Sequence, residues 1–380
     1  MKKTLVLTGG GSAGHVTPNM ALIKELEGEN IDIHYIGSKE GIEKELISGL
    51  SIPYHSISSG KLRRYADFEN VKDMFKVAKG CTEALWILKQ LKPGLVFSKG
   101  GFVSVPVIAA AKLLGIPIFI HESDLTPGLA NRISKRFASK IYTSFEETLQ
   151  YLPNGKAQAI GSPIRREILS GIKEKGLEFL GFDRTRPVLA IMGGSLGAKK
   201  INEAVRQEIE QIGGQFQIVH LCGKGNLDPA LEGRPGYRQF EFLNSELSDV
   251  LACTDLMVTR GGSNAIFEFL ALRIPMLIIP LSRKQSRGDQ ILNAKSFEEK
   301  GYSLTLQEED LTAASLAGYI ALLSKHRESI LKQMEESRMK DALSVMAGNI
   351  GTNCSRIRPS GSLFAFLFGS KKENQAYLLI

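Results

Sequence analysis

Cysteine is scarce in this chain of 380 residues. The four cysteines are spread along the sequence, at Cys81, Cys222, Cys253 and Cys354. They form no CxxC pair, and no histidine stands at the spacing that a zinc site requires, so we expect no metal site. Scattered cysteines of this kind are typical of reduced thiols in a cytoplasm.

Long apolar runs are also missing, and we find none that approaches the roughly 20 residues of a membrane-spanning helix. The start, Met1-Lys2-Lys3, has the charge of a signal-peptide n-region. The apolar run that follows, Leu5-Val6-Leu7, soon gives way to glycines. A buried strand fits this run better than a signal peptide does.

Nucleic-acid motifs are absent as well, although the net charge of +8 favours anionic partners. A nucleotide, a lipid headgroup and a diphosphate substrate all suit this charge. Because the chain has no RNA-binding aromatic motif and no recognisable DNA-reading module, we expect no nucleic-acid partner. With 43% hydrophobic residues, a chain of this length can build two packed domains.

Short apolar runs alternate with longer amphipathic stretches, the pattern of an α/β fold. In the first half we expect strands at residues 4–8, 31–36, 95–98, 116–121, 140–143 and 157–160. In the second half we expect them at residues 188–192, 217–221, 237–240, 256–259, 275–279 and 302–305. The repeat predicts two Rossmann-like domains, each a parallel sheet with ligand sites at the carboxyl ends of its strands.

Glycine and proline punctuate the chain at Gly161-Ser162-Pro163, where we expect the domain boundary. The N-terminal domain then covers residues 1–162 and the C-terminal domain residues 163–342. Good helix formers predict helix at residues 311–341. Residues 343–380 form a tail whose pattern, with an apolar run at 363–368, supports no structural prediction.

Four glycine-rich turns each follow a predicted strand, and we number them glycine loops 1 to 4. They are Gly9-Gly10-Gly11-Ser12-Ala13-Gly14-His15, Lys99-Gly100-Gly101-Phe102, Gly193-Gly194-Ser195-Leu196-Gly197-Ala198 and Arg260-Gly261-Gly262-Ser263-Asn264. Glycine lets backbone N–H groups approach a phosphate or sugar oxygen, and a following helix adds a favourable partial charge. One such turn can be a plain strand–helix connection, but four at matching strand ends predict polar ligands in a shared cleft.

Loop 1 matches the GxGxxG fingerprint of dinucleotide-binding enzymes. That fingerprint needs an acidic residue at the end of the second strand, where it binds the ribose. Here the second strand ends in His34-Tyr35-Ile36-Gly37-Ser38, without an acid. The sequence therefore disfavours an NAD enzyme, and we expect no cofactor.

Over residues 2–342 the sequence resembles the MurG family of glycosyltransferases. The resemblance rests on TGGGSAGHVTPNMAL, KGGFVSVP, GIPIFIHESDLTPGLAN, GSPIR, MGGSLGA, RGGSNAIFE and DQILNA, in this order. It implies a GT-B fold and an inverting transfer of N-acetylglucosamine from UDP-N-acetylglucosamine to lipid I, giving lipid II for peptidoglycan. It also implies a peripheral protein on the cytoplasmic face of the bacterial plasma membrane.

The resemblance further implies a donor held mainly by the C-terminal domain and an acceptor diphosphate met by loops 1 and 2. Arg165 would lie near the donor diphosphate, Leu243 beside the uracil and Glu268 on the ribose hydroxyls. The other donor-binding residues it implies are Ser12, Ala13, Gly14, Asp124, Gly194, Ser195, Ser263, Asn264, Ala265, Ile266, Asp289 and Gln290. Those for the acceptor diphosphate are Gly11, Gly14, Gly100 and Gly101.

Some positions depart from the family pattern. Asp124 stands where many members have an asparagine, and Asp289 replaces the first of two glutamines. Phe102 lacks the hydroxyl of the tyrosine often found in loop 2, and the tail after Ser344 does not resemble the family.

The expected chemistry needs groups that stabilise the departing UDP and a base for the attacking hydroxyl. Arg165, Ser195 and the N–H groups at loops 3 and 4 can stabilise the leaving group without a metal. For the base, His15 in loop 1 and Glu122 at a strand end facing the same cleft are both candidates. The sequence does not decide between them.

One segment predicts contact with a membrane. Val71, Met74, Phe75 and Ala78 recur at helical spacing and share one face. The basic residues around them are Lys61, Arg63, Arg64, Lys72, Lys76 and Lys79. Such a face either packs on the sheet or docks on anionic phospholipid, and we favour docking because members of the resembled family carry an apolar patch with basic neighbours here.

Three other functions remain open alternatives. The first is another GT-B enzyme with the same UDP site, a sugar-nucleotide 2-epimerase or a diacylglycerol glycosyltransferase. The second is a non-catalytic paralogue that binds a UDP-sugar or a lipid without turnover, and the third is the disfavoured NAD enzyme.

Overall fold

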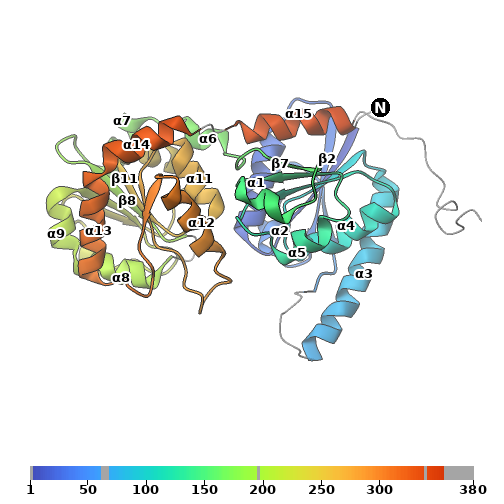
Figure 1. The fold of residues 1–380 in the computed structure, drawn as a ribbon, viewed down its shortest axis with the longest axis horizontal. Helices are drawn as coiled ribbons and strands as arrows, with labels where there is room; N and C mark the ends of the chain where they lie inside the picture. The colour runs from blue at the N-terminus through green and yellow to red at the C-terminus, as the bar shows by residue number, and fades with distance from the viewer. Residues whose placement is uncertain (1–2, 61–67, 195–196, 338–339, 355–380) are drawn as a thin grey trace, which may run out of the picture.

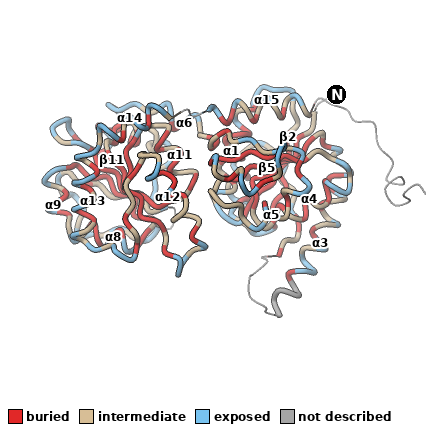
Figure 2. The backbone as a smooth tube through the Cα atoms, viewed as in Figure 1, coloured by how far each residue is buried: buried red, intermediate tan, exposed pale blue. Residues whose placement is uncertain are grey.

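The structure is a computed structural model, and it describes residues 3–60, 68–194, 197–337 and 340–354, of which residues 68–72 are described by their backbone alone. The described chain forms two α/β domains side by side, each built around one parallel sheet (Figure 1). Buried residues concentrate along the strands at the centre of each domain (Figure 2). The predicted architecture of two domains, each built on a parallel sheet, is thus confirmed.

The first domain holds a parallel sheet of seven described strands in the order β3-β2-β1-β4-β5-β6-β7. These strands are β1 (Lys3–Thr8), β2 (Ile31–Ser38), β3 (Tyr54–Ile57), β4 (Leu95–Ser98), β5 (Ile118–Glu122), β6 (Lys140–Thr143) and β7 (Ala157–Ala159). We did not predict β3. It is an edge strand with one buried residue in four, and its sequence Tyr-His-Ser-Ile contains no apolar run.

The second domain holds a parallel sheet of six described strands in the order β10-β9-β8-β11-β12-β13. They are β8 (Val188–Met192), β9 (Gln217–Leu221), β10 (Tyr237–Phe240), β11 (Leu256–Thr259), β12 (Met276–Ile278) and β13 (Ser303–Thr305). All six were predicted to within one residue. In both sheets the strand order reverses next to the first strand, a topology that opens a ligand crevice at the carboxyl edge.

Helices cover the sheets. Those of the first domain are α1 (Ala13–Glu25), α2 (Ile42–Ser48), α3 (Phe68–Leu91), α4 (Ser104–Leu113) and α5 (Leu129–Ser134). The second domain has α6 (Arg166–Leu169), α7 (Lys173–Leu180), α8 (Lys199–Gln207), α9 (Ile209–Gln215), α10 (Leu247–Ala252), α11 (Ser263–Ala271), α12 (Asp289–Glu299), α13 (Ala313–Lys325) and α14 (Arg327–Glu336). The helix expected at 311–341 is therefore two helices, which meet at His326.

The last described helix, α15 (Ala342–Cys354), returns to the first domain (Figure 1). Its side chains Leu343, Met346 and Ile350 are buried with core residues of α1 and β1. The chain thus passes between the domains twice, after β7 and after α14. The predicted boundary at 161–163 falls in the first passage, and the rest of the tail, residues 355–380, lies outside the described residues.

Arg166 connects the two interdomain segments of the chain with each other and with the first domain. Its guanidinium lies 2.8 Å from a carboxylate oxygen of Glu25 on α1 and 2.7 Å from one of Asp341, just before α15. The Arg166 hydrogen bonds lower the pKa of Glu25 below its usual value of 4.5, since they favour the carboxylate.

We therefore expect Arg166→Gln to lower the free energy of unfolding by about 1 kcal/mol, because the contact is partly exposed. Because the pKa of Glu25 is lower in the folded state than in the unfolded state, its contribution to stability is complete above the unfolded-state pKa. That contribution is lost as the pH falls through the folded-state pKa. The difference between variant and parent should thus shrink on acidification. Urea unfolding from neutral pH down to about pH 3 measures it.

The matched control is Arg184→Gln, whose ion pair with Glu174 is more than half exposed at both ends. It should leave the unfolding free energy nearly unchanged. A loss for Arg166→Gln that stays constant over the whole pH range would show that the Glu25 carboxylate is not responsible.

Candidate functional site

Glycine loops 1 and 2 follow the neighbouring strands β1 and β4 and touch one another. A Cβ atom added to Gly101 would lie 2.1 Å from the carbonyl oxygen of Gly10, and one added to Gly11 would lie 2.5 Å from the ring of Phe102. Both Gly11 and Gly101 also have positive φ, of 83° and 84°. Glycine is therefore required here for close approach of the two loops as well as for backbone conformation.

Loops 3 and 4 follow the neighbouring strands β8 and β11 of the second sheet. Gly194 in loop 3 has a φ of 98° and open space around it. Arg260, which opens loop 4, forms a buried ion pair of 2.6 Å with Glu308 and is therefore an anchor rather than a free cation. The predicted phosphate-binding Ser195 lies outside the described residues.

Loop 4 meets loop 1 through Asn264, at the start of α11. Its Nδ2 donates a hydrogen bond of 2.9 Å to the carbonyl oxygen of Gly14 in loop 1. Its Oδ1 accepts one of 3.3 Å from Ser123 Oγ, just after β5. Residues predicted for one site thus meet across the domain interface.

A second contact across the interface includes both acidic departures from the family pattern. Asn293 on α12 is fully buried and donates through Nδ2 to Asp124 Oδ1 at 3.0 Å, while its Oδ1 accepts from the N–H of Leu125. Asp289 Oδ1 lies 3.5 Å from the hydroxyl of Thr126. We did not single out Asn293, although it lies within the DQILNA motif.

On the donor side, Arg165 and Glu268 pair with each other. Arg165 Nε and Nη2 donate to the two carboxylate oxygens of Glu268 at 2.9 and 3.1 Å. Burial opposes the charge of Arg165, but the Glu268 carboxylate raises the pKa of the guanidinium. Beside the pair lies a cavity of about 270 Å³ between α1 and the second domain, lined also by Asn244 and Leu247.

The other predicted donor residues differ in what they can offer a ligand. Ile266 is fully buried in the second-domain core, and Leu243 and Ala265 pack partly buried against it. The amide oxygen of Gln290 accepts a hydrogen bond of 3.0 Å from the N–H of Leu281. Because its side chain is buried, Ile266 can face a ligand only through its backbone.

His15 is held by its neighbours in loop 1. Its Nδ1 lies 2.9 Å from Ser12 Oγ. Burial lowers the pKa of the imidazole below 6.5, and the positive charge of Lys99 lowers it further. His15 is therefore neutral at pH 7, the state that a general base requires.

Glu122, the other candidate base, is buried with both carboxylate oxygens occupied. Oε1 accepts from the N–H of Asp124 at 3.1 Å, and Oε2 accepts from the N–H of Gly128 at 3.0 Å and from Asn131 Nδ2 at 2.9 Å. Burial, followed by the charge of Asp124, raises the pKa of Glu122 to about 7. The carboxylate shapes the turn of residues 123–128.

Lys99, at the floor of the site, is a functional candidate that we missed. Its side chain is buried, and Nζ donates to His121 Nδ1 at 2.6 Å and to Ser123 Oγ. Burial lowers the pKa of Lys99 to about 8, although Glu122 and Asp124 act in the opposite direction. The sequence did contain a signal for this role, because Lys99 stands between a predicted buried strand and the glycines of loop 2.

Glu43 on α2 is a second residue that we missed. It is fully buried, and its carboxylate accepts hydrogen bonds of 3.1 Å from the N–H groups of Gly11 and Ser38. The N–H of Gly11, expected on the acceptor diphosphate, is therefore engaged by Glu43 in this structure. The local sequence around Glu43 resembles an ordinary surface helix and gives no signal for this contact.

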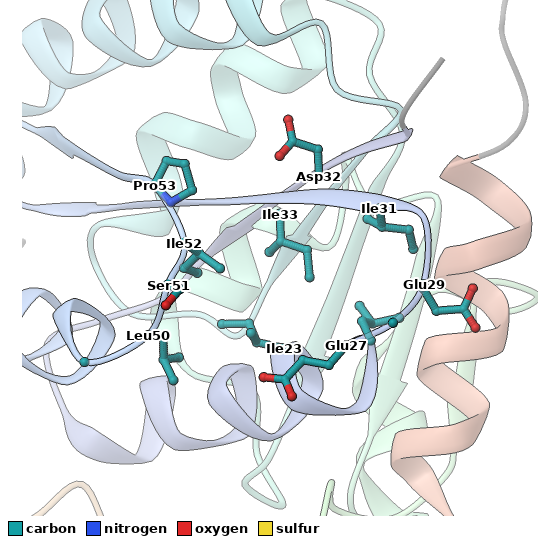
Figure 3. Close-up of a pocket in the computed structure, with 13 residues that line it drawn as sticks. Ile23, Glu27, Glu29, Ile31, Asp32, Ile33, Leu50, Ser51, Ile52 and Pro53 are labelled. Atoms are coloured by element: carbon teal, nitrogen blue, oxygen red, sulfur yellow. The ribbon is translucent and has the colours of Figure 1, made fainter.

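A larger cavity than the one beside Arg165 lies elsewhere, in the first domain. It has a volume of about 450 Å³ at the amino ends of β2 and β3, with an apolar floor and the acidic side chains Glu27, Glu29 and Asp32 (Figure 3). Glycine loops 1 and 2 stand at the opposite, carboxyl edge of the same sheet, and loops 3 and 4 belong to the second sheet. This cavity is therefore separate from the candidate site.

The predicted membrane segment lies on α3, which projects beyond the first domain (Figure 1). Met74 and Phe75 are 65% and 74% exposed, and Ala78, Lys76 and Lys79 are exposed beside them. Met74 and Phe75 therefore do not pack on the sheet. The side chains of Val71 and Lys72, and residues Lys61, Arg63 and Arg64, lie outside what the structure describes.

Trp86, three turns along α3 from Phe75, is also 64% exposed, and we had not included it. No helix in the described part of the chain is long and apolar enough to span a membrane. Among the described residues, no cluster of three or more His, Cys, Asp or Glu side chains could hold a metal ion.

Comparisons with known proteins agree with this geometry. Residues 5–143 match the profile of the glycosyltransferase family 28 N-terminal domain, and residues 188–346 match that of its C-terminal domain. The crystal structure of Acinetobacter baumannii MurG superposes with a TM-score of 0.74 at 23% identity, covering 92% of this chain and 99% of that one. The calicheamicin glycosyltransferase CalG4 superposes with a TM-score of 0.68 at 14% identity, over 94% and 100% of the two chains.

Curated relatives are much more similar in sequence. A protein of Bacillus cereus named UDP-N-acetylglucosamine--N-acetylmuramyl-(pentapeptide) pyrophosphoryl-undecaprenol N-acetylglucosamine transferase 2 is 56% identical, over 92% of this chain and 99% of its own. A transferase of the same name, without the number, from Shouchella clausii is 56% identical over 90% and 96% of the two chains. The chain is a glycosyltransferase and belongs to the MurG family.

Proposed function

We propose that this chain transfers N-acetylglucosamine from UDP-N-acetylglucosamine to the N-acetylmuramoyl sugar of lipid I, with inversion at the anomeric carbon. The observation that carries the proposal is the contact between loops 1 and 4, from two switch points, made by Gly14 and Asn264. The names of the Bacillus cereus and Shouchella clausii relatives support the same donor and acceptor.

For the donor, we place UDP against the second domain beside Arg165 and Glu268. A ribose offers hydroxyl donors to the Glu268 carboxylate, and the diphosphate offers an anion to Arg165, so the nucleotide can satisfy both partners of the present ion pair. The start of α11 adds N–H groups, since its N-cap residue Gly262 provides no capping side chain.

For the chemistry, we assign the base to His15. The attacking hydroxyl oxygen forms a bond to the anomeric carbon as the bond to UDP breaks, and the hydroxyl proton passes to the imidazole. His15 is neutral and lies on loop 1, whereas both oxygens of Glu122 are engaged by the turn that follows it. Arg165 stabilises the charge that develops on the departing UDP.

We further propose that the chain works as a peripheral protein on the cytoplasmic face of the plasma membrane. Lipid I carries an apolar tail and must be met at the bilayer surface. The exposed apolar residues Met74, Phe75 and Trp86 can enter the headgroup region while the neighbouring lysines attract anionic phospholipid.

The transfer itself is tested with radiolabelled UDP-N-acetylglucosamine and lipid I. We expect the parent to form labelled lipid product and His15→Ala to lower kcat by about 10²- to 10⁴-fold, the usual contribution of a general base. UDP affinity, measured by calorimetry, should stay within about twofold because His15 belongs to the opposite domain.

The control is His326→Ala, an exposed histidine between α13 and α14, which should behave as the parent. If the parent gives no labelled lipid although it binds UDP, transfer to lipid I is excluded, and the chain is either non-catalytic or another GT-B enzyme with the same UDP site. If His15→Ala loses UDP affinity and keeps its kcat, His15 belongs to the donor site.

Removing the Glu268 carboxylate tests the ribose assignment. Glu268→Ala should weaken donor binding by about 1.5–3 kcal/mol, the range for hydrogen bonds to charged groups. The control Glu299→Ala removes an exposed carboxylate on α12 and should have no effect on donor binding. UDP and NAD titrations complete the test: an unchanged donor KM for Glu268→Ala, or tighter binding of NAD than of UDP, would contradict the assignment.

The membrane prediction concerns α3. Met74→Asp with Phe75→Asp should abolish co-sedimentation with anionic phospholipid vesicles and slow transfer to lipid I, because two charges then replace the apolar contact. Transfer to a water-soluble short-chain acceptor should be unchanged. Leu322→Asp, at an exposed apolar residue of α13, is the control. Sedimentation of the double variant at the parent level would exclude this surface as the docking site.

A further inference from the structure

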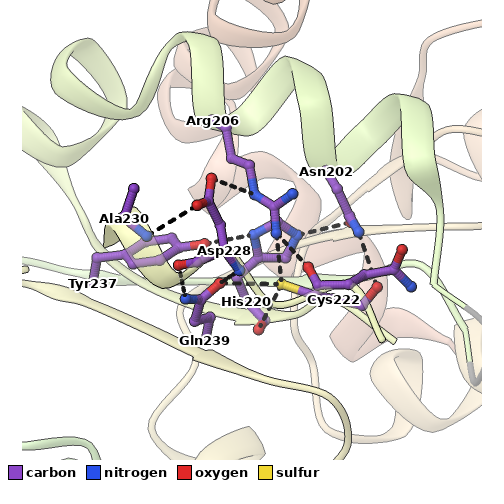
Figure 4. Close-up of polar contacts among 9 residues, drawn as sticks. Asn202, Arg206, His220, Cys222, Asp228, Ala230, Tyr237 and Gln239 are labelled. Carbon is purple, nitrogen blue, oxygen red and sulfur yellow. Dashed lines mark hydrogen bonds and ion pairs between the residues drawn. The ribbon is translucent and has the colours of Figure 1, made fainter. Parts of the chain in front are cut away.

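A buried polar cluster in the second domain joins side chains of α8, β9 and β10 (Figure 4). Its centre is His220 on β9, which is fully buried. His220 Nε2 lies 3.0 Å from Asn202 Oδ1 on α8, and its Nδ1 lies 3.0 Å from the hydroxyl of Tyr237 on β10. Neither the strand pattern nor the glycine motifs had drawn attention to these three residues.

The direction of each hydrogen bond in the cluster follows from its neighbours. Asn202 Nδ2 donates to the carbonyl oxygen of Cys222 at 2.9 Å, so Asn202 Oδ1 is an acceptor. His220 Nε2 must then carry the proton, and Nδ1 accepts from the Tyr237 hydroxyl. Burial lowers the pKa of His220 to about 3, so the imidazole stays neutral. The three side chains therefore form one directed chain that ends on the Cys222 carbonyl.

That carbonyl lies against the donor loop. A Cβ atom added to Gly197 would come within 2.0 Å of it, so the backbone of loop 3 packs directly on Cys222. Gly197 has a φ of 76°, and its N–H closes loop 3 on the carbonyl oxygen of Gly194 at 2.9 Å. A displacement of the Cys222 carbonyl would therefore be passed on to Gly197 and Gly194.

The turn that contains Cys222 is fixed from its other side too. Arg206, one helical turn after Asn202 on α8, donates to the carbonyl oxygen of Asn226. The side-chain amide of Gln239 on β10 donates to the carbonyl oxygen of Asp228 at 2.6 Å and accepts from its N–H at 3.0 Å. Side chains of α8 and β10 thus hold residues 222–228 in one position.

The other end of β9 offers a comparison. Gln217 is equally buried, and its amide bonds the backbone of Asp183 and Arg186 at 2.9–3.0 Å. That end of the strand faces away from the glycine loops, so the hydrogen bonds of Gln217 contribute to the stability of the fold alone. At the carboxyl end, a buried cluster whose polar atoms are all hydrogen-bonded allows one geometry of the backbone. Apolar side chains of similar volume would not restrict it in this way.

We propose that Asn202, His220 and Tyr237 are positioning residues for the donor diphosphate, which they hold in register by fixing the Cys222 carbonyl under Gly197 of loop 3. The inference rests on the proposed donor site and deepens it. None of the three side chains touches the ligand. Their effect passes through backbone, so it should appear in donor affinity and much less in turnover at saturating donor.

The test compares two buried amides of the same domain. Asn202→Ala removes the donor to Cys222, and Gln217→Ala removes the amide at the other end of β9. Both should lower the unfolding midpoint to a similar extent. Only Asn202→Ala should weaken UDP binding and raise the donor KM, by about tenfold, the effect of one lost hydrogen bond to a buried partner. Its kcat at saturating donor should stay within about threefold.

Tyr237→Phe is a second test of the same role, for the case in which Asn202→Ala does not fold. It deletes one hydroxyl and keeps the ring, so the fold should persist while UDP affinity falls by about two- to fivefold. Equal UDP affinity in Asn202→Ala, Gln217→Ala, Tyr237→Phe and parent would overturn the positioning role and leave the donor site intact. If the parent itself fails to bind UDP, the proposed donor site and the inference fail together.

Discussion

A parallel sheet whose strand order reverses beside its first strand leaves a crevice at its carboxyl edge, because the helices on either side of the reversal cross to opposite faces. Both sheets of this chain carry that reversal, and both crevices open onto the domain interface. The proposed base and the N–H groups at the start of α11 both follow from this constraint. Loops 1 and 2 present His15 from one crevice, and loops 3 and 4 present the start of α11 from the other.

Most charged side chains of the candidate site are paired with other groups of the chain, and this determines its electrostatics. Lys99 and Glu122 are buried at neighbouring strand ends, and their hydrogen bonds go to the chain itself. Arg165 and Glu268, by contrast, pair with each other, and Arg165 lines a cavity. In the donor site proposed above, this ion pair would exchange partners with an incoming nucleotide at small cost, because no buried charge would be left without a partner.

Much of this arrangement could be predicted from sequence because it depends on local patterns. Twelve strands and the four glycine loops follow from apolar runs and glycine spacing, whereas the exposure of Phe75 was expected because of the resemblance to the family, since helical periodicity also allowed packing on the sheet. β3 could not be predicted, since an edge strand needs little apolar content. Glu43 and Asn293 were also beyond reach, because their roles depend on which loops face them after folding. Asp124, a departure from the family pattern, gains its interdomain partner only in three dimensions.

The return of α15 to the first domain sets an order for assembly during synthesis. The second domain is continuous in sequence and can complete its core as soon as α14 has left the ribosome. The first domain is not continuous, since Leu343, Met346 and Ile350 belong to its core. It therefore waits, with part of its apolar surface uncovered, until the later domain has been made. The half of the protein that is translated first is the half that finishes folding last.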